Sequence, residues 1–295
     1  MTDSRQTAGR RTPSGVEIVV AQYAGYCYGV ERALKIAEEA RLTLAPPIYT
    51  LGPLIHNPSV VERLANKGIR AISSLDEAER GSVIVRAHGV APEIIDQARQ
   101  RGLNVIDATC PFVGVAQRKA RELHRRGYLP LILGEREHPE VTSLKARAGE
   151  EALVVEGAED LPLQTLHDRR VGVVVQTTQT REKLAELAAA LAPVVRELLV
   201  FNTICDATGN RQDAARELAS EVDAVVVVGG RNSANTTHLA DLCQALQPRT
   251  WHVETAAELQ AEWFAGCRRI GVVAGASTPE GEIQATVRRI EELVG

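Results

Sequence analysis

The stretch Ala224-Val225-Val226-Val227-Val228 is apolar at every position and leads into the small polar cluster Asn232-Ser233-Ala234-Asn235. A short run of β-branched residues without polar alternation predicts a strand buried on both faces, as in a parallel sheet covered by helices. Other short apolar runs end in the same kind of cluster. They predict strands at 17–21, 48–51, 82–85, 104–106, 129–133, 171–175 and 270–273.

Amphipathic stretches follow many of these predicted strands. Residues 30–37 and 113–123 carry apolar side chains at helical spacing, and residues 210–218 repeat the pattern later in the chain. Apolar residues that recur every three or four positions predict helices that cover a sheet with one face. The fold class that follows is α/β, with mostly parallel sheets.

The alternation of strands and helices divides the chain into three parts of similar size. We expect a loose, polar N-terminal tail over 1–15, followed by α/β units at 16–110, 111–204 and 205–295, the last ending in a C-terminal helix. No Pro-, Gly- or Ser-rich linker separates these parts, and no repeat is visible at the level of residues. The units are therefore expected to pack closely.

The composition excludes several classes of protein. The chain has 295 residues, of which 44% are hydrophobic and 24% charged, as expected of a globular protein. The net charge of −4 and the few aromatic residues (Trp 2, Tyr 5, Phe 3) argue against nucleic acid as a partner. No apolar run approaches the roughly 18 to 20 residues of a membrane span. Five scattered cysteines do not build a disulfide scaffold, and they favour a reducing compartment, the cytoplasm.

In open parallel sheets, ligands bind beyond the carboxyl ends of the strands, so the strand ends are where function is expected. Three cysteines, Cys27, Cys110 and Cys205, stand at such ends, each just before a predicted helix and nearly evenly spaced along the chain. A helix N-terminus stabilises a thiolate. Three thiolates without a fourth suit an iron–sulfur cluster with one open iron, whereas closed zinc sites prefer four ligands in CxxC-type pairs. The alternative is that the three are core cysteines, as expected for Cys243 and Cys267.

Histidines and one glutamate share the same strand ends. His56, His88 and His138 each adjoin a Gly, Pro or Asn that shapes a tight loop, and imidazoles, hydroxyls and helix-end amides together can hold a phosphate. Glu140 follows His138 by two residues, and a carboxyl group beside a bound diphosphate can stay protonated and act as a general acid. The alternatives are hydrogen-bonded loop histidines and a solvated glutamate.

Nine motifs occur in an order that resembles one enzyme family. They are GYCYGVERAL, GPLIHNPSVV, RAHGV, DATCPFV, EHPEV, QTTQT, NRQ, NSAN and GAS. From about residue 17 to about residue 290, the chain is similar to the 4-hydroxy-3-methylbut-2-enyl diphosphate reductase family. Members of this family catalyse the last step of the methylerythritol phosphate route to isoprenoid precursors. No single motif is decisive, but nine in this order are highly specific.

The resemblance implies three α/β units around a central cavity and a 4Fe-4S cluster held by Cys27, Cys110 and Cys205. It implies that the open iron binds the hydroxyl oxygen of an allylic diphosphate substrate. Two electrons from a reduced ferredoxin or flavodoxin then remove this hydroxyl as water, which gives isopentenyl and dimethylallyl diphosphate.

The resemblance also assigns the other residues at the strand ends. It implies that Glu140 is the proton donor, and that the substrate contacts are His56, His88, His138, Thr177, Ser233, Asn235 and Ser277. The chain departs from the family at Ala234, where many members have a second serine, and at Tyr26 and Tyr28, where phenylalanines are usual.

Two other functions use the same residues. A non-redox iron–sulfur hydro-lyase also needs an open iron on three cysteines, but it acts without an electron donor. A non-enzymatic metal or redox sensor would hold zinc on the three thiols or form switchable disulfides.

Overall fold

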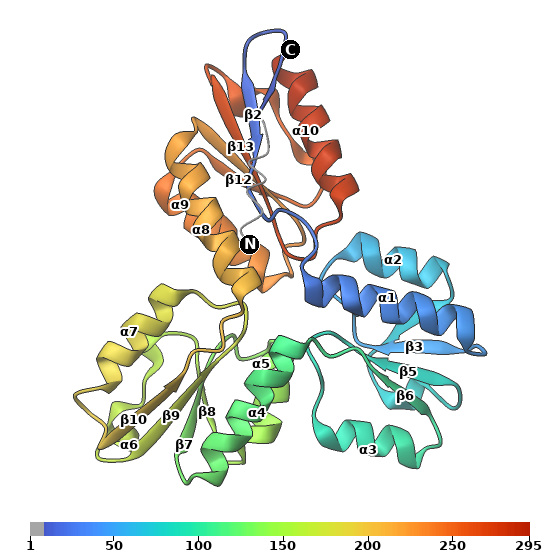
Figure 1. The fold of residues 1–295 in the computed structure, drawn as a ribbon, viewed down its shortest axis with the longest axis vertical. Coiled ribbons are helices and arrows are strands. Elements are labelled where there is room, and N and C mark those ends of the chain that lie inside the picture. Colours follow the sequence, from blue (N-terminus) through green and yellow to red (C-terminus); the bar gives the residue numbers. More distant parts are fainter. Residues whose placement is uncertain (1–8) are drawn as a thin grey trace, which may run out of the picture. The chain divides into compact units, whose positions relative to one another are not determined.

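The computed structural model describes residues 9–295, and within them the strands form three sheets (Figure 1). The chain divides into two compact units. Unit 1 consists of Met1–Tyr28, His56–Pro58 and Asp206–Gly295, and unit 2 consists of Gly29–Ile55 and Ser59–Cys205. No helix within residues 9–295 is both long enough and apolar enough to cross a membrane.

Unit 1 is built on one five-stranded sheet, here called the β11 sheet, with the order β1-β2-β13-β11-β12. All of its strand pairs are parallel except β1 with β2. Its strands are β1 (Arg10–Arg11), β2 (Glu17–Val20), β11 (Ala224–Val228), β12 (Thr250–Val253) and β13 (Arg269–Ala274). Its long helices are α8 (Asp206–Glu221), α9 (Ala234–Leu246) and α10 (Glu280–Val294), and the short 3-10 helices η3 (Ala256–Glu258) and η4 (Ala261–Phe264) follow β12.

Unit 2 contains two four-stranded parallel sheets. The β3 sheet has the order β4-β3-β5-β6, and the β7 sheet has the order β10-β9-β7-β8. The β3 sheet consists of β3 (Ile48–Leu51), β4 (Ile69–Ile72), β5 (Ser82–Val85) and β6 (Asn104–Asp107), with α1 (Tyr28–Thr43), α2 (Pro58–Asn66), η1 (Leu75–Glu77) and α3 (Pro92–Gln100). The β7 sheet consists of β7 (Leu129–Leu133), β8 (Leu153–Val155), β9 (Arg170–Val175) and β10 (Glu197–Phe201), with α4 (Pro111–Arg125), α5 (Pro139–Ala148), η2 (Ala158–Asp160), α6 (Leu163–Leu166) and α7 (Arg181–Leu191).

The three sheets share one topology. Read from the second strand along the chain, their orders are β4-β3-β5-β6, β8-β7-β9-β10 and β12-β11-β13-β2, so that the N-terminal strand β2 completes the sheet of the C-terminal segment. In each sheet the second strand pairs with one side of the first strand, and the third strand pairs with its other side. The end of the first and third strands is therefore a topological switch point, where ligands of open parallel sheets bind.

Strand β11 shows why the apolar run decides the fold. All five of its residues are fully buried. Val225 and Val227 belong to the core cluster that includes Leu239 of α9, whereas Val226 and Val228 pack in the cluster that includes Val287 of α10. Both faces of the strand are thus covered, and burial of each valine contributes about 1.5–3 kcal/mol.

The α/β class and all eight predicted strands are confirmed, with ends that differ by a residue at most. Among residues 9–295, the strands that the sequence missed are β1, β4, β8, β10 and β12, each at the edge of its sheet, whereas the edge strand β6 was predicted. Several residues of β10 and β12 are only half-buried, so their apolar runs are shorter or mixed with polar side chains. Edge strands bury less surface, and the apolar pattern that predicts a strand is weaker there.

The N-terminal segment differs from the expected tail. Residues 1–8 lie outside the described part of the chain, but Arg10 and Arg11 pair with β2 in an antiparallel hairpin. The turn closes with a hydrogen bond of 2.9 Å from the Thr12 amide to the Val16 carbonyl, and Gly15 supplies a φ of 90°. The prediction of a loose tail is therefore wrong at residues 10 and 11. The turn at residues 12–16, which pairs them with β2, was not predicted from the sequence. The boundaries of the three units stay a prediction, with β2 joined to the β11 sheet.

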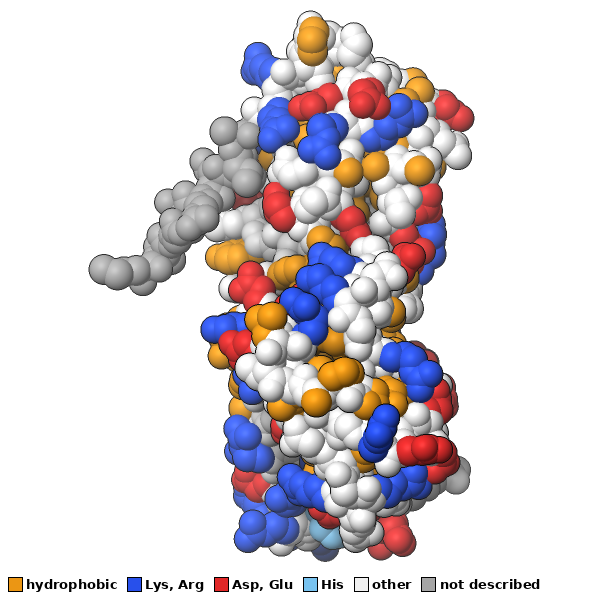
Figure 2. Space-filling view, turned by 90° about the vertical axis from the view of Figure 1, so that its right-hand side faces the viewer, with side chains coloured by type: hydrophobic (Ala, Val, Ile, Leu, Met, Phe, Trp, Pro, Cys, Tyr) orange, Lys and Arg blue, Asp and Glu red, His pale blue; other side chains and the backbone are white. Residues whose placement is uncertain are grey.

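Charged side chains are interspersed on the surface. On the face shown in Figure 2, Lys and Arg alternate with Asp and Glu, with hydrophobic side chains between them. This mixture agrees with the small net charge of −4.

Candidate functional site

The three predicted cluster cysteines share one local structure. Each follows the fourth strand of its sheet and directly precedes a helix: Cys27 precedes α1, Cys110 precedes α4 and Cys205 precedes α8. Each backbone amide donates a hydrogen bond to the loop after the neighbouring third strand. The acceptors are the carbonyls of Ala276 for Cys27 (3.1 Å), Ala87 for Cys110 (2.9 Å) and Thr177 for Cys205 (3.1 Å). The shared topology thus fixes the thiols at helix starts, as predicted.

The five cysteines fall into two groups by burial. Cys27, in unit 1, and Cys110 and Cys205, in unit 2, are half-buried. Cys243 and Cys267 are buried, and desolvation raises the pKa of Cys243 to about 12 and also raises that of Cys267. A buried thiol with a raised pKa is inert, whereas an accessible thiol at a helix start can bind metal as a thiolate. The prediction that Cys243 and Cys267 are packing residues is confirmed.

Glu140 is a fully buried residue beside the β7 sheet of unit 2. It lies in the first turn of α5, where His138 is the N-cap and Pro139 occupies the first helical position. Thr177, two residues after β9, donates to both carboxylate oxygens, from its amide to Oε1 at 2.7 Å and from its hydroxyl to Oε2 at 2.8 Å. Burial raises the pKa of Glu140 to about 7, although the two bonds from Thr177 lower it and the nearby Glu135 raises it further.

This environment gives the carboxyl group two accessible protonation states near neutral pH. In the protonated form, Oε1 keeps the amide of Thr177 as its donor, and the proton on Oε2 can be donated to the hydroxyl of Thr177. No rearrangement of the pair is needed, because a hydroxyl both donates and accepts. The arrangement therefore suits an acid that delivers a proton at physiological pH.

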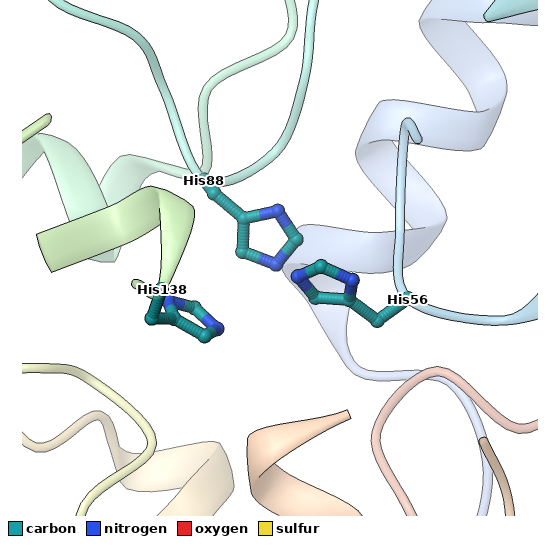
Figure 3. Close-up of side chains that lie close together, drawn as sticks. All are labelled: His56, His88 and His138. Atoms are coloured by element: carbon teal, nitrogen blue, oxygen red, sulfur yellow. The ribbon is translucent and has the colours of Figure 1, made fainter. Parts of the chain in front are cut away.

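His88 and His138 lie next to one another in unit 2 (Figure 3). Their rings meet edge to face, with centroids 5.3 Å apart. The amide of Glu140 donates to Nδ1 of His138 at 3.1 Å, so this nitrogen is an acceptor and the proton of the neutral ring sits on Nε2. His138 is thus held as a donor, and the bond that orients it also orients Glu140.

A second group of polar residues lies in unit 1, at the ends of β11 and β13. Ser233 is the N-cap of α9 and accepts from the amide of Thr236, and the hydroxyl of Ser277 donates to the carbonyl of His56 at 3.0 Å. Asn235 is only 4% exposed, yet neither atom of its amide group has a hydrogen-bond partner among residues 9–295. A buried polar group without a partner costs about 1–3 kcal/mol, so the amide indicates a ligand that completes its bonds.

The predicted residues therefore form two groups. In unit 2 the structure brings together His88, His138, Glu140 and Thr177. The backbone amide of Cys205 donates to the carbonyl of Thr177, and that of Cys110 donates to the carbonyl of Ala87, the residue before His88. In unit 1 it brings Cys27 and His56 to the loop that contains Ser277, while Ser233 and Asn235 begin α9.

Two residues that the sequence did not single out hold the loops of unit 2. The hydroxyl of Ser143 lies 3.1 Å from the carbonyl of His88 and 2.9 Å from that of Glu140, and Gln117 donates to it at 3.1 Å. Both lie inside helices, where a polar residue carries no signal until its neighbours are known. They tie the loop after β5 to the start of α5.

Parallel sheets covered by helices, half-buried cysteines at helix starts and a buried carboxyl group with a pKa of about 7 at the end of a sheet are features typical of an α/β enzyme. The model of the LytB protein family matches residues 18–291. The chain therefore belongs to the LytB protein family, the family of 4-hydroxy-3-methylbut-2-enyl diphosphate reductase, and this confirms the resemblance of the nine motifs.

Curated relatives carry the name 4-hydroxy-3-methylbut-2-enyl diphosphate reductase. The relative from Aquifex aeolicus is 45% identical over 282 residues, which cover 94% of this chain and 97% of the relative. The relative from Geobacter sulfurreducens is 47% identical over 279 residues, with 94% and 98% covered.

Two solved structures agree with the fold. One is described as (E)-4-hydroxy-3-methyl-but-2-enyl diphosphate reductase, the terminal enzyme of the non-mevalonate pathway; it is 43% identical, with a TM-score of 0.68 over 93% of this chain and 99% of that one. The other is the E-1-hydroxy-2-methyl-but-2-enyl-4-diphosphate reductase from Plasmodium falciparum, 28% identical, with a TM-score of 0.85 over 95% and 88%.

Proposed function

We propose that this chain catalyses the reductive dehydroxylation of (E)-4-hydroxy-3-methylbut-2-enyl diphosphate to isopentenyl and dimethylallyl diphosphate. The family membership supports a reductase of the non-mevalonate pathway. The observation that carries the proposal is Glu140, a fully buried acid with a pKa of about 7 beside two histidines. Such a group protonates a poor leaving group under physiological conditions.

Cys27, Cys110 and Cys205 would hold the cluster. They are half-buried thiols at helix starts, and their chemistry fits iron and sulfide, whereas Cys243 and Cys267 are enclosed in apolar cores. A 4Fe-4S cluster on three protein thiolates supplies low-potential electrons and one open iron that acts as a Lewis acid. Reduced ferredoxin or flavodoxin would supply the two electrons, and the half-buried thiols suit a reducing compartment, the cytoplasm.

The proton balance gives Glu140 its role. Replacing the hydroxyl of the substrate by hydrogen consumes two electrons and two protons; the carbon–oxygen bond breaks, one proton leaves with the hydroxyl as water, and the other joins a carbon of the allyl group. Glu140 delivers the first of these protons, and Thr177 holds the carboxyl group through both of its oxygens. General acids at such a step accelerate it by about 10²–10⁴-fold.

Seven residues would bind the substrate. The unpartnered amide of Asn235 and the first turn of α9 suit the oxygens of a diphosphate, because both present N–H donors to an anion. Nε2 of His138 is a further donor, since Nδ1 accepts from Glu140. The proposal assigns binding to His56, His88, His138, Thr177, Ser233, Asn235 and Ser277.

The test is a turnover assay on anaerobically purified protein with reconstituted iron and sulfide. Chemically reduced methyl viologen should be oxidised only when the allylic diphosphate is added, with both products formed. An intact cluster without turnover would contradict the proposal. Activity without an electron donor would indicate the hydro-lyase, and bound zinc without sulfide would indicate the sensor.

A further inference from the structure

A pocket of about 560 Å³ lies within unit 2, and none of the residues assigned above is part of its lining. It opens at the carboxyl ends of β4, β3 and β5, and α3 forms one wall. We call it the Arg86 pocket, and the part of its lining used here consists of Arg86, Leu51, Ile72, Leu75, Val90 and Ile94. Its volume falls within the range of about 300–1,000 Å³ typical of small-molecule sites.

The pocket lies at the switch point of the β3 sheet. Gly52 directly follows β3 and Arg86 directly follows β5, which are the first and third strands of the sheet. The guanidinium of Arg86 lies against Gly52, so closely that a Cβ at this position would be 2.5 Å from Nη1. The φ of +74° favours glycine at position 52, and the absence of a side chain there leaves room for the arginine to lie across the strand ends.

Arg86 is a half-buried cation without a counter-charge. Its buried Nε has no acceptor, and no hydrogen bond or ion pair of its guanidinium occurs among residues 9–295. Burial lowers the pKa of this group, and no neighbouring acid offsets the effect. A desolvated charge without a partner destabilises a fold. Its presence therefore indicates a function other than stability.

In the β7 sheet, the residue at the position equivalent to Arg86 has hydrogen-bond partners within the protein. Gln176 directly follows β9 as Arg86 follows β5, and it is fully buried. Its Oε1 accepts from the amide of Glu135 at 2.9 Å, and its Nε2 donates to the hydroxyl of Thr178 at 2.7 Å. In the β7 sheet, both polar atoms of the side chain at the switch point therefore have hydrogen-bond partners within the protein.

The β7 and β11 sheets share a further contact, between an arginine and a glutamate, at the ends of their first and second strands. In the β7 sheet, Glu156 after the second strand accepts from the amide of Arg136 at 2.9 Å, and the side chain of Arg136 donates to the carbonyl of Val154 at 2.7 Å. In the β11 sheet, Glu254 accepts from the amide of Arg231 at 2.8 Å. These contacts cross between the ends of the first and second strands and cover them.

The β3 sheet has Leu54 and Ser73 at the positions of this arginine and glutamate. Neither residue can form the charged contact, so the ends of β3 and β4 stay uncovered and the pocket opens there. Of the other charged residues in its lining, Arg101 pairs with Asp76 at 2.8 Å. The pocket thus keeps one unpaired positive charge, that of Arg86, among apolar walls.

We propose that the Arg86 pocket binds a small amphipathic anion, with its carboxylate or phosphate group paired to Arg86 and its aliphatic body against Leu51, Ile72 and Ile94. A planar guanidinium matches both head groups with two parallel hydrogen bonds. The site is separate from Glu140, Thr177 and the three cysteines, and it does not depend on the proposed reductase activity.

The test is calorimetric titration of the full-length, cluster-loaded protein with three probes: hexyl phosphate, hexanoate and hexanol. We expect saturable binding of at least one anion, and the tighter of the two identifies the head group. Arg86→Met should weaken this binding about 10- to 100-fold, because a hydrogen-bonded charge pair is lost. Arg99→Gln, which removes a solvent-exposed arginine from α3, should leave it within about twofold.

A further variant separates the pocket from the substrate site. Asn235→Ala should keep the binding of the anion, because Asn235 belongs to the β11 sheet of unit 1. Binding that is lost in Asn235→Ala and kept in Arg86→Met would overturn the proposal, as would equal binding of hexanol or no saturable binding of either anion. Arg86→Met should also melt at the same or a higher temperature than the parent protein, and a clear loss of stability would show a structural role instead.

Discussion

The buried polar residues at the ends of the β7 sheet and of the β11 sheet differ in whether their side chains have hydrogen-bond partners. Glu140, after β7, is buried and has a partner for each carboxylate oxygen, whereas Asn235, after β11, is buried with an amide that has none among residues 9–295. The satisfied group is ready to hold and release a proton without moving. The unsatisfied group can form hydrogen bonds to a ligand without breaking any within residues 9–295.

The same comparison extends to the third strands of these sheets. Thr177 follows β9 by two residues and Ser277 follows β13 by three. The hydroxyl of Thr177 donates to the side chain of Glu140, whereas the hydroxyl of Ser277 donates to the backbone carbonyl of His56. One topology therefore places a buried carboxyl group with two hydrogen-bond partners beside the β7 sheet, and beside the β11 sheet a buried amide with none among residues 9–295. The difference arises from a few residues at the strand ends.

The largest expected effect concerns a feature that all three sheets share, the cysteine at a helix start. Cys110→Ser should lose iron and sulfide, and turnover should fall to background, because two thiolates do not hold the cluster. Cys243→Ala, in the apolar core of the β11 sheet, should keep both. The measurement is iron and sulfide content with the electronic spectrum, and a normal cluster in Cys110→Ser would remove this residue from the site.

Glu140→Gln should lower kcat by about 10²–10⁴-fold with little change in KM. The amide keeps the shape of the side chain and can still accept from Thr177, but it has no proton to deliver. Steady-state kinetics under anaerobic conditions measure this effect. A kcat close to that of the parent protein would exclude Glu140 as the acid.

Stability should depend on pH through Glu140. Its pKa in the folded protein is about 7 against an ordinary value of 4.5, so folding favours the protonated form. The stabilisation is complete below about pH 4.5 and is lost as pH rises through about 7, by up to about 3 kcal/mol. Denaturant unfolding at pH 5 and pH 8 should show this loss in the parent protein. An equal loss in Glu140→Gln would assign it to other groups.

The smallest expected effect is that of Asn235→Ala. It should raise KM by about 5- to 150-fold, which corresponds to about 1–3 kcal/mol, with kcat little changed. Without substrate, the variant should be as stable as the parent protein or more stable, since a buried amide without partners is removed. A marked loss of stability would show that the amide supports the fold rather than the ligand.

The sequence predicted the interior strands, the edge strand β6 and the three helix-start cysteines because each leaves a local signal. Continuous apolar runs mark strands such as β11, and Cys110 directly precedes Pro111 at the start of α4. The repeated topology left no such signal, since residues at equivalent positions, such as Arg86 and Gln176, are chemically different.

The partners of the site residues could not be predicted because they depend on strand pairing. Glu140 meets Thr177 only because β7 pairs with β9, which brings the ends of the two strands together. The register of parallel strands is set by packing and not by neighbouring residues in the chain. For the same reason the sequence could not show that Asn235 is left without a partner and Glu140 is not.

The pH dependence of kcat tests the central claim, that Glu140 delivers the proton, most directly. With cluster-loaded protein under anaerobic conditions, kcat should fall about tenfold per pH unit above a value near the pKa of Glu140, about 7, because the acid must be protonated. In Glu140→Gln the residual rate should lack this decline. The same decline in the variant would contradict the account.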